Sequence, residues 1–182
     1  FYYWLYFSLI SFIVGIYFAL RLNYNSQIIS LGISLPLLFL YNAKIKNYPL
    51  IGNIIVSLII GLSFIYAGVV FENVKPLIVP SLLAFGLTLI REVVKDIADL
   101  KGDETIGART LPIVIGKQKA IYFCTILSIL LSIAAFTLFL IGYYNFYYGV
   151  LLIITVEIPL GVVVISLLNK PHIETAKKAA KL

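Results

Sequence analysis

Apolar residues follow one another in six long runs, and polar residues gather in the short stretches between them. Within the runs the apolar positions are continuous, whereas a membrane-spanning strand alternates apolar and polar positions over about ten residues. Since a helix needs about 20 mostly apolar residues to cross a bilayer, the pattern predicts an all-α, multi-spanning transmembrane helix bundle. The run at 27–41 is the weakest, because it is short and contains Pro36. The predicted spans are 1–20, 27–41, 50–71, 77–94, 120–141 and 148–168.

Composition supports the same fold class. Apolar residues make up 62% of the 182 positions and charged residues only 12%, compared with roughly 45–50% and about 25% in soluble domains. The one cysteine, Cys124, lies inside an apolar run, so we expect a packed thiol there rather than a disulfide.

The distribution of Lys and Arg predicts the orientation of the chain. If the first span runs outward from the cytoplasm, the outer connections hold only Arg21 and Lys75 of the 14 basic residues, which leaves twelve on the inner side. Basic residues accumulate on the cytoplasmic side of membrane proteins. We therefore expect a multi-pass cell-membrane protein with its longer polar loops, and any active site, facing the cytoplasm. The net charge of +6 then reflects orientation, and nucleic acid is not an expected partner.

The ends of the sequence suggest a larger protein. The chain contains no methionine, begins inside an apolar run and stops in a basic stretch. We expect residues 1–182 to form one transmembrane domain that is incomplete at both ends. The sequence indicates no particular oligomeric state.

An acidic cluster lies where the fourth predicted span ends. It consists of Glu92, Asp96, Asp99 and Asp103, and the spacing of 4, 3 and 4 places all four on one face of a helix continuous with the 77–94 span. Like charges one turn apart cost about 0.2–0.5 kcal/mol per pair. Carboxylates at a helix C-terminus also oppose the macrodipole by roughly 0.3–1 kcal/mol each. A positively charged partner is therefore expected.

Two kinds of partner suit these carboxylates. One is a neighbouring basic side chain, as in an i,i+4 pair between Lys95 and Asp99. The other is Mg²⁺, which prefers oxygen ligands and usually binds one or two carboxylates together with substrate phosphates. In the second case we expect Gly102 to turn the chain so that Asp99 and Asp103 converge on one ion.

The residues around the cluster carry a resemblance to a known family. The sequence is Arg91-Glu92-x-x-Lys95-Asp96-x-x-Asp99-x-x-Gly102-Asp103, followed by Gly107-x-Arg109-Thr110-Leu111-Pro112 and Gly116. This stretch resembles the second aspartate-rich motif of the UbiA-type intramembrane prenyltransferases. The spacing of the acids, the position of the glycine and the Arg-Thr-Leu-Pro tail all agree with that motif. The resemblance implies nine helices, with acidic motifs on cytoplasmic loops after the second and sixth. The six spans would then be the third to the eighth, without the first motif, and we expect this stretch alone to be inactive.

The resemblance also implies a reaction, the transfer of an isoprenyl group from its diphosphate to a lipid-like acceptor among membrane lipids. Mg²⁺ and basic side chains would stabilise the departing diphosphate, and an apolar site would keep water from the allylic cation. The implied catalytic and metal-binding residues are Asp96, Asp99 and Asp103. The candidate substrate-binding residues are Tyr41, Lys44, Lys46, Asn53, Lys95, Lys101 and Arg109.

Simpler roles exist for several of these candidates. The basic side chains also serve as orientation charges or lipid-headgroup contacts. Asn53 shares a helix face with Ser57 and Gly61, and a stripe of small residues often mediates close helix packing.

Glu157 lies beside Pro159 in the last span, where an ionisable residue is a functional hypothesis by default. The alternative is a hydrogen bond from Glu157 to backbone freed by the proline.

Within the family, the Arg-Glu-x-x-Lys-Asp variant and the Lys-rich chain look most like archaeal-type members. Those add a second geranylgeranyl group to geranylgeranylglyceryl phosphate in ether-lipid biosynthesis. A quinone precursor such as 4-hydroxybenzoate is the alternative acceptor. A membrane transporter is the alternative of another class, although the spans contain few charged groups that could line a path.

Overall fold

The computed structural model describes residues 2–43, 48–169 and 173–180, and all regular structure in these ranges is helical. The long elements are α1 (Tyr2–Leu20), α4 (Ile51–Val70), α5 (Ile78–Thr105) and α7 (Lys117–Leu140). Two further long segments are composite. One joins α2 (Tyr24–Gln27), the π-helix η1 (Ile28–Ser34) and α3 (Leu35–Ala43), and the other joins α8 (Phe146–Leu152), the π-helix η4 (Ile153–Glu157) and α9 (Ile158–Asn169). The short elements are η3 (Lys75–Leu77), α6 (Leu111–Ile115) and α10 (Ile173–Ala179).

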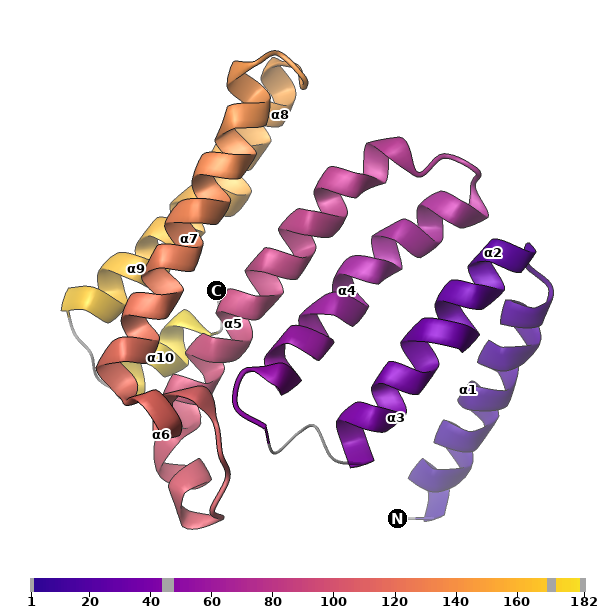
Figure 1. Ribbon diagram of the computed structural model, residues 1–182, viewed down its shortest axis with the longest axis horizontal. Helices are drawn as coiled ribbons and strands as arrows, with labels where there is room; N and C mark the ends of the chain where they lie inside the picture. Colours follow the sequence, from indigo (N-terminus) through magenta and orange to yellow (C-terminus); the bar gives the residue numbers. More distant parts are fainter. Residues whose placement is uncertain (1, 44–47, 170–172, 181–182) are drawn as a thin grey trace.

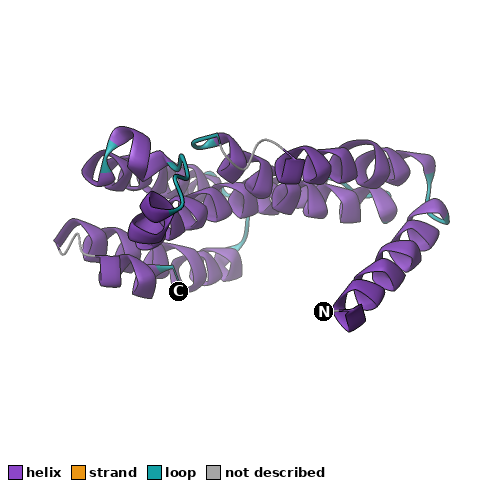
Figure 2. Cartoon of the chain, turned by 90° about the horizontal axis from the view of Figure 1, so that it is seen from below, coloured by secondary structure: helices purple, strands orange, loops and turns teal. Residues whose placement is uncertain are grey.

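Successive long helices run back and forth and lie beside one another from α1 to α5 (Figure 1). The α7 helix and the α8–α9 segment form a pair on the other side of α5, and α10 packs against α5 and α9. Seen from below, α1 leans out of this row, and the C-terminus lies on the same side of the row as the N-terminus (Figure 2). The described helices thus form an open, curved layer.

The membrane-spanning character predicted from hydropathy is confirmed. Within the described ranges, five helical segments are long and apolar enough to cross a bilayer, namely Tyr24–Ala43, Ile51–Val70, Lys75–Thr105, Lys117–Leu140 and Phe146–Asn169. The α1 helix contributes a shorter apolar stretch, Leu5–Leu20. The weak second run is therefore a full helical segment, whereas the count of six spans stays a prediction.

Both composite segments change from π-helical to α-helical geometry just before a proline. The N–H of Leu35 bonds to the carbonyl of Ser30, and the N–H of Ile158 bonds to that of Ile153. Each of these bonds spans five residues rather than four. Pro36 and Pro159 follow one position later, and because proline lacks an N–H, it cannot form the ordinary α-helical bond. The wider π turns keep each segment helical through the proline.

The best-packed part of the molecule surrounds the lower half of α5 in Figure 1. Val93 and Ile97 on α5 are buried against Ile121 and Cys124 on α7. Leu111 and Pro112, from the Leu-Pro part of the tail that follows the acidic cluster, are buried at the start of α6. This core holds the acid-bearing end of α5 in place, and Cys124 is the buried free thiol that was predicted.

The α4 and α5 helices form the most extensive helix pair, and small residues on α4 allow it. Gly61 is buried, and a Cβ added there would lie 3.1 Å from the backbone oxygen of Ser81 and 3.3 Å from Cβ of Phe85. The hydroxyl of Ser81 donates to the carbonyl of Gly61 at 2.8 Å. The packing role of the Ser57 and Gly61 stripe is thus confirmed, since Ser57 is also fully buried.

We predict that Gly61→Leu separates α4 from α5 and destabilises the protein by about 1–3 kcal/mol, because overpacking forces backbone shifts. Thermal unfolding in detergent measures the effect. Gly15→Leu is the matched control, since no atom lies within 4 Å of a Cβ added at Gly15. Equal melting temperatures for the two variants would contradict the close packing described above.

Candidate functional site

The predicted site residues that the structure describes lie toward one end of the helix layer. Tyr41 lies near the end of α3, Asn53 in the first turn of α4, and the acidic cluster in the last turns of α5. In Figure 1 the end of α3, the start of α4 and the end of α5 all lie toward the lower side of the molecule. The topology therefore brings them to one face, as the sequence predicted.

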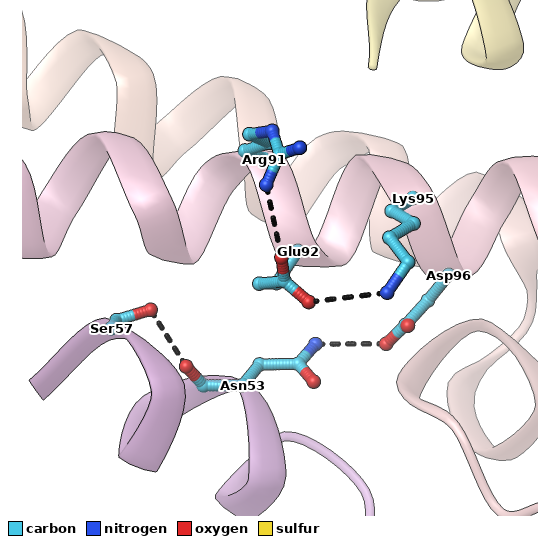
Figure 3. Close-up of polar contacts among 6 residues, drawn as sticks. All are labelled: Asn53, Ser57, Arg91, Glu92, Lys95 and Asp96. Atoms are coloured by element: carbon cyan, nitrogen blue, oxygen red, sulfur yellow. Dashed lines mark hydrogen bonds and ion pairs between the residues drawn. The ribbon is translucent and has the colours of Figure 1, made fainter. Parts of the chain in front are cut away.

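Asp96 is held by a residue from the neighbouring helix. Nδ2 of Asn53 donates to Oδ2 of Asp96 at 2.8 Å, across 43 positions of sequence (Figure 3). The Ser57 hydroxyl donates to the Asn53 backbone carbonyl at 2.6 Å, one turn further along α4. The structure therefore joins the small-residue stripe of α4 to the acidic cluster of α5, a link that the sequence did not predict.

Glu92 is compensated by basic neighbours on its own helix. Its carboxylate lies 3.4 Å from the Arg91 guanidinium and 3.6 Å from the Lys95 ammonium, and its side chain is only 13% exposed. Figure 3 shows Lys95 reaching back toward Glu92. The hypothetical pair between Lys95 and Asp99 is therefore replaced by an i,i+3 pair with Glu92.

The prediction of a turn at Gly102 is wrong. The α5 helix continues through Gly102 to Thr105, and the chain reverses at Gly107, which has a positive φ of 67°. A glycine inside a helix costs only about 1 kcal/mol relative to alanine, so the surrounding helix tolerates it. As a result, Asp99 and Asp103 stay one turn apart on a continuous helix.

The carboxylates differ in exposure and do not form a closed metal cage. Asp99 is exposed, whereas Asp96 and Asp103 are half-buried. In the part of the chain that the structure describes, no group of three His, Cys, Asp or Glu side chains is placed to hold a metal ion alone. The expected convergence of all three aspartates on one ion is therefore not seen.

Asp96 lies beyond the apolar stretch 77–94, on the polar end of α5. Burial raises the pKa of its carboxyl to about 6, and the hydrogen bond from Asn53 opposes the rise. The negative charges of Asp103 and Glu92 raise this pKa further, because a nearby like charge disfavours the ionised form. A cation near these groups would favour their ionised forms.

The donor set suits Mg²⁺ bound together with a phosphorylated ligand. Mg²⁺ favours oxygen ligands, keeps several waters and is commonly bound by one or two carboxylates plus substrate phosphates. Asp96, Asp99 and Asp103 supply carboxylates on successive turns, and Asp99 is open to solvent. The arrangement fits an ion completed by a diphosphate, and does not fit one enclosed by protein alone.

The basic candidates are accessible where they are described. Lys95, Lys101 and Arg109 are exposed, and Arg109 lies in the loop between α5 and α6. Tyr41 is half-buried. The remaining two candidates, Lys44 and Lys46, lie outside the described residues.

Glu157 has a partner that the sequence did not identify. The Ser132 hydroxyl on α7 donates to Oε2 of Glu157 at 2.6 Å, whereas Oε1 is buried without a partner among the described residues. Glu157 is the last residue of η4, two positions before Pro159. The structure shows this contact across helices rather than the bond to proline-freed backbone that was the alternative to a functional role.

Thr110 is a residue of the motif region that the sequence analysis left without a role. Its hydroxyl is buried and has no partner within the described ranges, although the residue occupies the N-cap position of α6. The only sequence signal was its place in the Arg-Thr-Leu-Pro tail, between an exposed arginine and the buried Leu111 and Pro112.

These features define a multi-pass helical membrane protein with a carboxylate-bearing helix end at one face. Residues 3–182 match the model of the UbiA prenyltransferase family. The chain belongs to that family, and the resemblance seen in the acidic motif is confirmed.

Several relatives of this chain carry one name, digeranylgeranylglyceryl phosphate synthase. The chain is 35% identical over 152 residues to the digeranylgeranylglyceryl phosphate synthase of Methanosphaera stadtmanae, covering 84% of this chain and 54% of that protein. The chain is 37% identical over 175 residues to the enzyme of the same name from Saccharolobus solfataricus, and the match covers 94% of this chain and 60% of that protein. The chain is 34% identical over 177 residues to the digeranylgeranylglyceryl phosphate synthase of Pyrococcus horikoshii, and the match covers 97% of this chain and 62% of that protein.

A solved structure shares the fold as well. It comes from work on digeranylgeranylglyceryl phosphate synthase in membranes, is 35% identical and superposes with a TM-score of 0.79. The match covers 96% of this chain and 62% of the solved one. The chain thus spans between 54% and 62% of the length of these relatives.

Proposed function

We propose that the protein containing this chain transfers a geranylgeranyl group from its diphosphate to geranylgeranylglyceryl phosphate, in ether-lipid biosynthesis. The observation that carries the proposal is the acid-bearing end of α5, with Asp96 fixed by Asn53, in a chain of the UbiA family. The name shared by the relatives supports the choice of both substrates. We also propose that residues 1–182 are part of a single prenyltransferase domain.

In this reaction the bond between C1 of the isoprenyl group and the diphosphate oxygen breaks, and its electron pair leaves with the diphosphate. The acceptor hydroxyl then attacks the allylic cation at C1 and passes its proton to the released diphosphate. Mg²⁺, held by carboxylates among Asp96, Asp99 and Asp103 together with the diphosphate itself, would supply positive charge against the leaving diphosphate. The lipid-facing helices would exclude water from the cation.

The basic residues have separate roles in this proposal. Lys101 and Arg109 lie on the same exposed end as the carboxylates and would bind phosphate oxygens, for which Lys and Arg provide charge-assisted hydrogen bonds. Tyr41, near the end of α3, would complete the substrate site together with Lys44 and Lys46. Lys95 would bind substrate after releasing its ion pair with Glu92. Twelve of the 14 Lys and Arg residues lie on this side in the predicted topology, which supports a site that faces the cytoplasm.

We predict that product formation requires Mg²⁺ and that Asp99→Ala or Asp103→Ala lowers the rate by about 100-fold or more, because the leaving diphosphate loses its counter-charge. The assay uses the full-length protein in detergent with geranylgeranyl diphosphate and geranylgeranylglyceryl phosphate. Glu104→Ala, which removes an exposed acid beside Asp103, is the control and should retain nearly full activity. Undiminished turnover in excess chelator would refute the proposed chemistry.

We predict that Arg109→Gln raises the KM for geranylgeranylglyceryl phosphate about tenfold, the loss expected for one charge-assisted hydrogen bond. The KM for geranylgeranyl diphosphate should change much less. Lys119→Gln, an exposed basic residue in the first turn of α7, serves as the matched control. Efficient prenylation of 4-hydroxybenzoate, together with an unchanged acceptor KM in Arg109→Gln, would instead identify a quinone precursor as the acceptor.

A further inference from the structure

The contact between Asn53 and Asp96 differs from the other polar contacts of the acidic cluster. Glu92 pairs with basic side chains on its own helix, whereas Asp96 accepts a hydrogen bond from an amide on α4. Figure 3 shows the Asn53 side chain extending from α4 toward Asp96. The partner of Asp96 is thus neutral and comes from a different element.

The position of the Asn53 amide is fixed by its surroundings. Gly52 and Ser57, on either side of it along α4, are buried, and the Ser57 hydroxyl bonds to the Asn53 carbonyl at 2.6 Å. Further along the same helix pair, the Ser81 hydroxyl bonds to the Gly61 carbonyl. These contacts hold α4 against α5, so the Asn53 amide approaches Asp96 from a fixed position.

A neutral donor has a specific chemical effect on a carboxylate. It orients one oxygen, here Oδ2, and leaves the other for a cation. It also leaves the negative charge in place, whereas an ammonium group such as the one that Lys95 gives to Glu92 would compete with a cation for the carboxylate. Carboxylates that bind metals are commonly oriented by hydrogen bonds of this kind, and removing such a partner typically costs 10–100-fold in metal affinity or activity.

From these contacts we propose that Asn53 is a positioning residue. Its amide orients the Asp96 carboxylate for a divalent cation bound together with a diphosphate. The inference rests on the function proposed above and changes the role of Asn53, which the sequence suggested as a direct substrate contact. In this role Asn53 acts through Asp96 and stays on the protein side of the carboxylate.

Direct cation binding tests the role without turnover. Mn²⁺ is titrated into the full-length protein with inorganic diphosphate, and the free ion is followed by electron paramagnetic resonance. Asn53→Ala should weaken Mn²⁺ binding by about 10–100-fold. Asn53→Gln, which keeps an amide donor, should recover part of the loss. Ser63→Ala, which removes an exposed hydroxyl further along α4 that bonds to the Ile60 carbonyl, is the matched control and should bind Mn²⁺ within a few-fold of the natural protein.

Kinetics distinguish positioning from direct substrate contact. For Asn53→Ala we expect the Mg²⁺ concentration at half-maximal rate to rise about 10–100-fold, with most of the rate recovered at saturating Mg²⁺. A raised KM for the isoprenyl diphosphate with unchanged Mn²⁺ and Mg²⁺ dependence would overturn the proposal and make Asn53 a substrate contact. Unchanged behaviour in every assay would overturn it as well.

Two further variants keep the test decisive. If Asn53→Ala does not fold, Asn53→Leu replaces it, because it has a similar size but no amide donor and no added charge, and it should bind Mn²⁺ at least tenfold more weakly. Wild-type Mn²⁺ binding by that variant would overturn the proposal. Asp96→Asn distinguishes failure of the proposed cation site from failure of the role proposed for Asn53. If it retains full Mg²⁺-dependent activity, the proposed site is wrong; if it is inactive while Asn53→Ala is normal, only the role of Asn53 is wrong.

Discussion

Like charges at the C-terminal end of α5 have to be offset for that helix to keep its form. Carboxylates repel one another when they are one turn apart, and they oppose the helix dipole at that end. The compensation changes along the helix. Glu92 has two basic neighbours, Asp96 has a neutral amide, and Asp99 is open to solvent. The uncompensated charge therefore increases toward the tip, where a cation and a diphosphate would be most stabilising.

Close packing holds this charged end in a fixed position. Val93 and Ile97 bury its inner face in the core, and Pro112 is buried directly after the loop that follows. Gly61 brings α4 near enough for side chains of the two helices to meet. A set of carboxylates on a loop would spread apart under its own repulsion. Here the rigid helix keeps them within electrostatic reach of one another.

The sequence was informative where the physical signal is local and failed where it depends on three-dimensional context. Continuous apolar runs predicted the spans, and acid spacing predicted the shared face of α5. The glycine at 102 was misinterpreted, because helix continuation outweighs its small cost and the reversal takes place at Gly107. The π-helical turns before Pro36 and Pro159 leave no pattern of their own in the sequence. The bond from Asn53 to Asp96 joins positions 43 apart, so only the packing of α4 on α5 reveals it.

The central claim is that the carboxylates of α5 bind a cation which in turn binds a diphosphate. The most direct measurement is an experimental structure of the full-length protein with Mn²⁺ and a non-reactive isoprenyl thiodiphosphate, using anomalous scattering to locate the metal. We expect an anomalous peak from a metal bonded to carboxylate oxygens among Asp96, Asp99 and Asp103 and to the diphosphate. A diphosphate bound elsewhere, or a metal bonded to none of these aspartates, would contradict it.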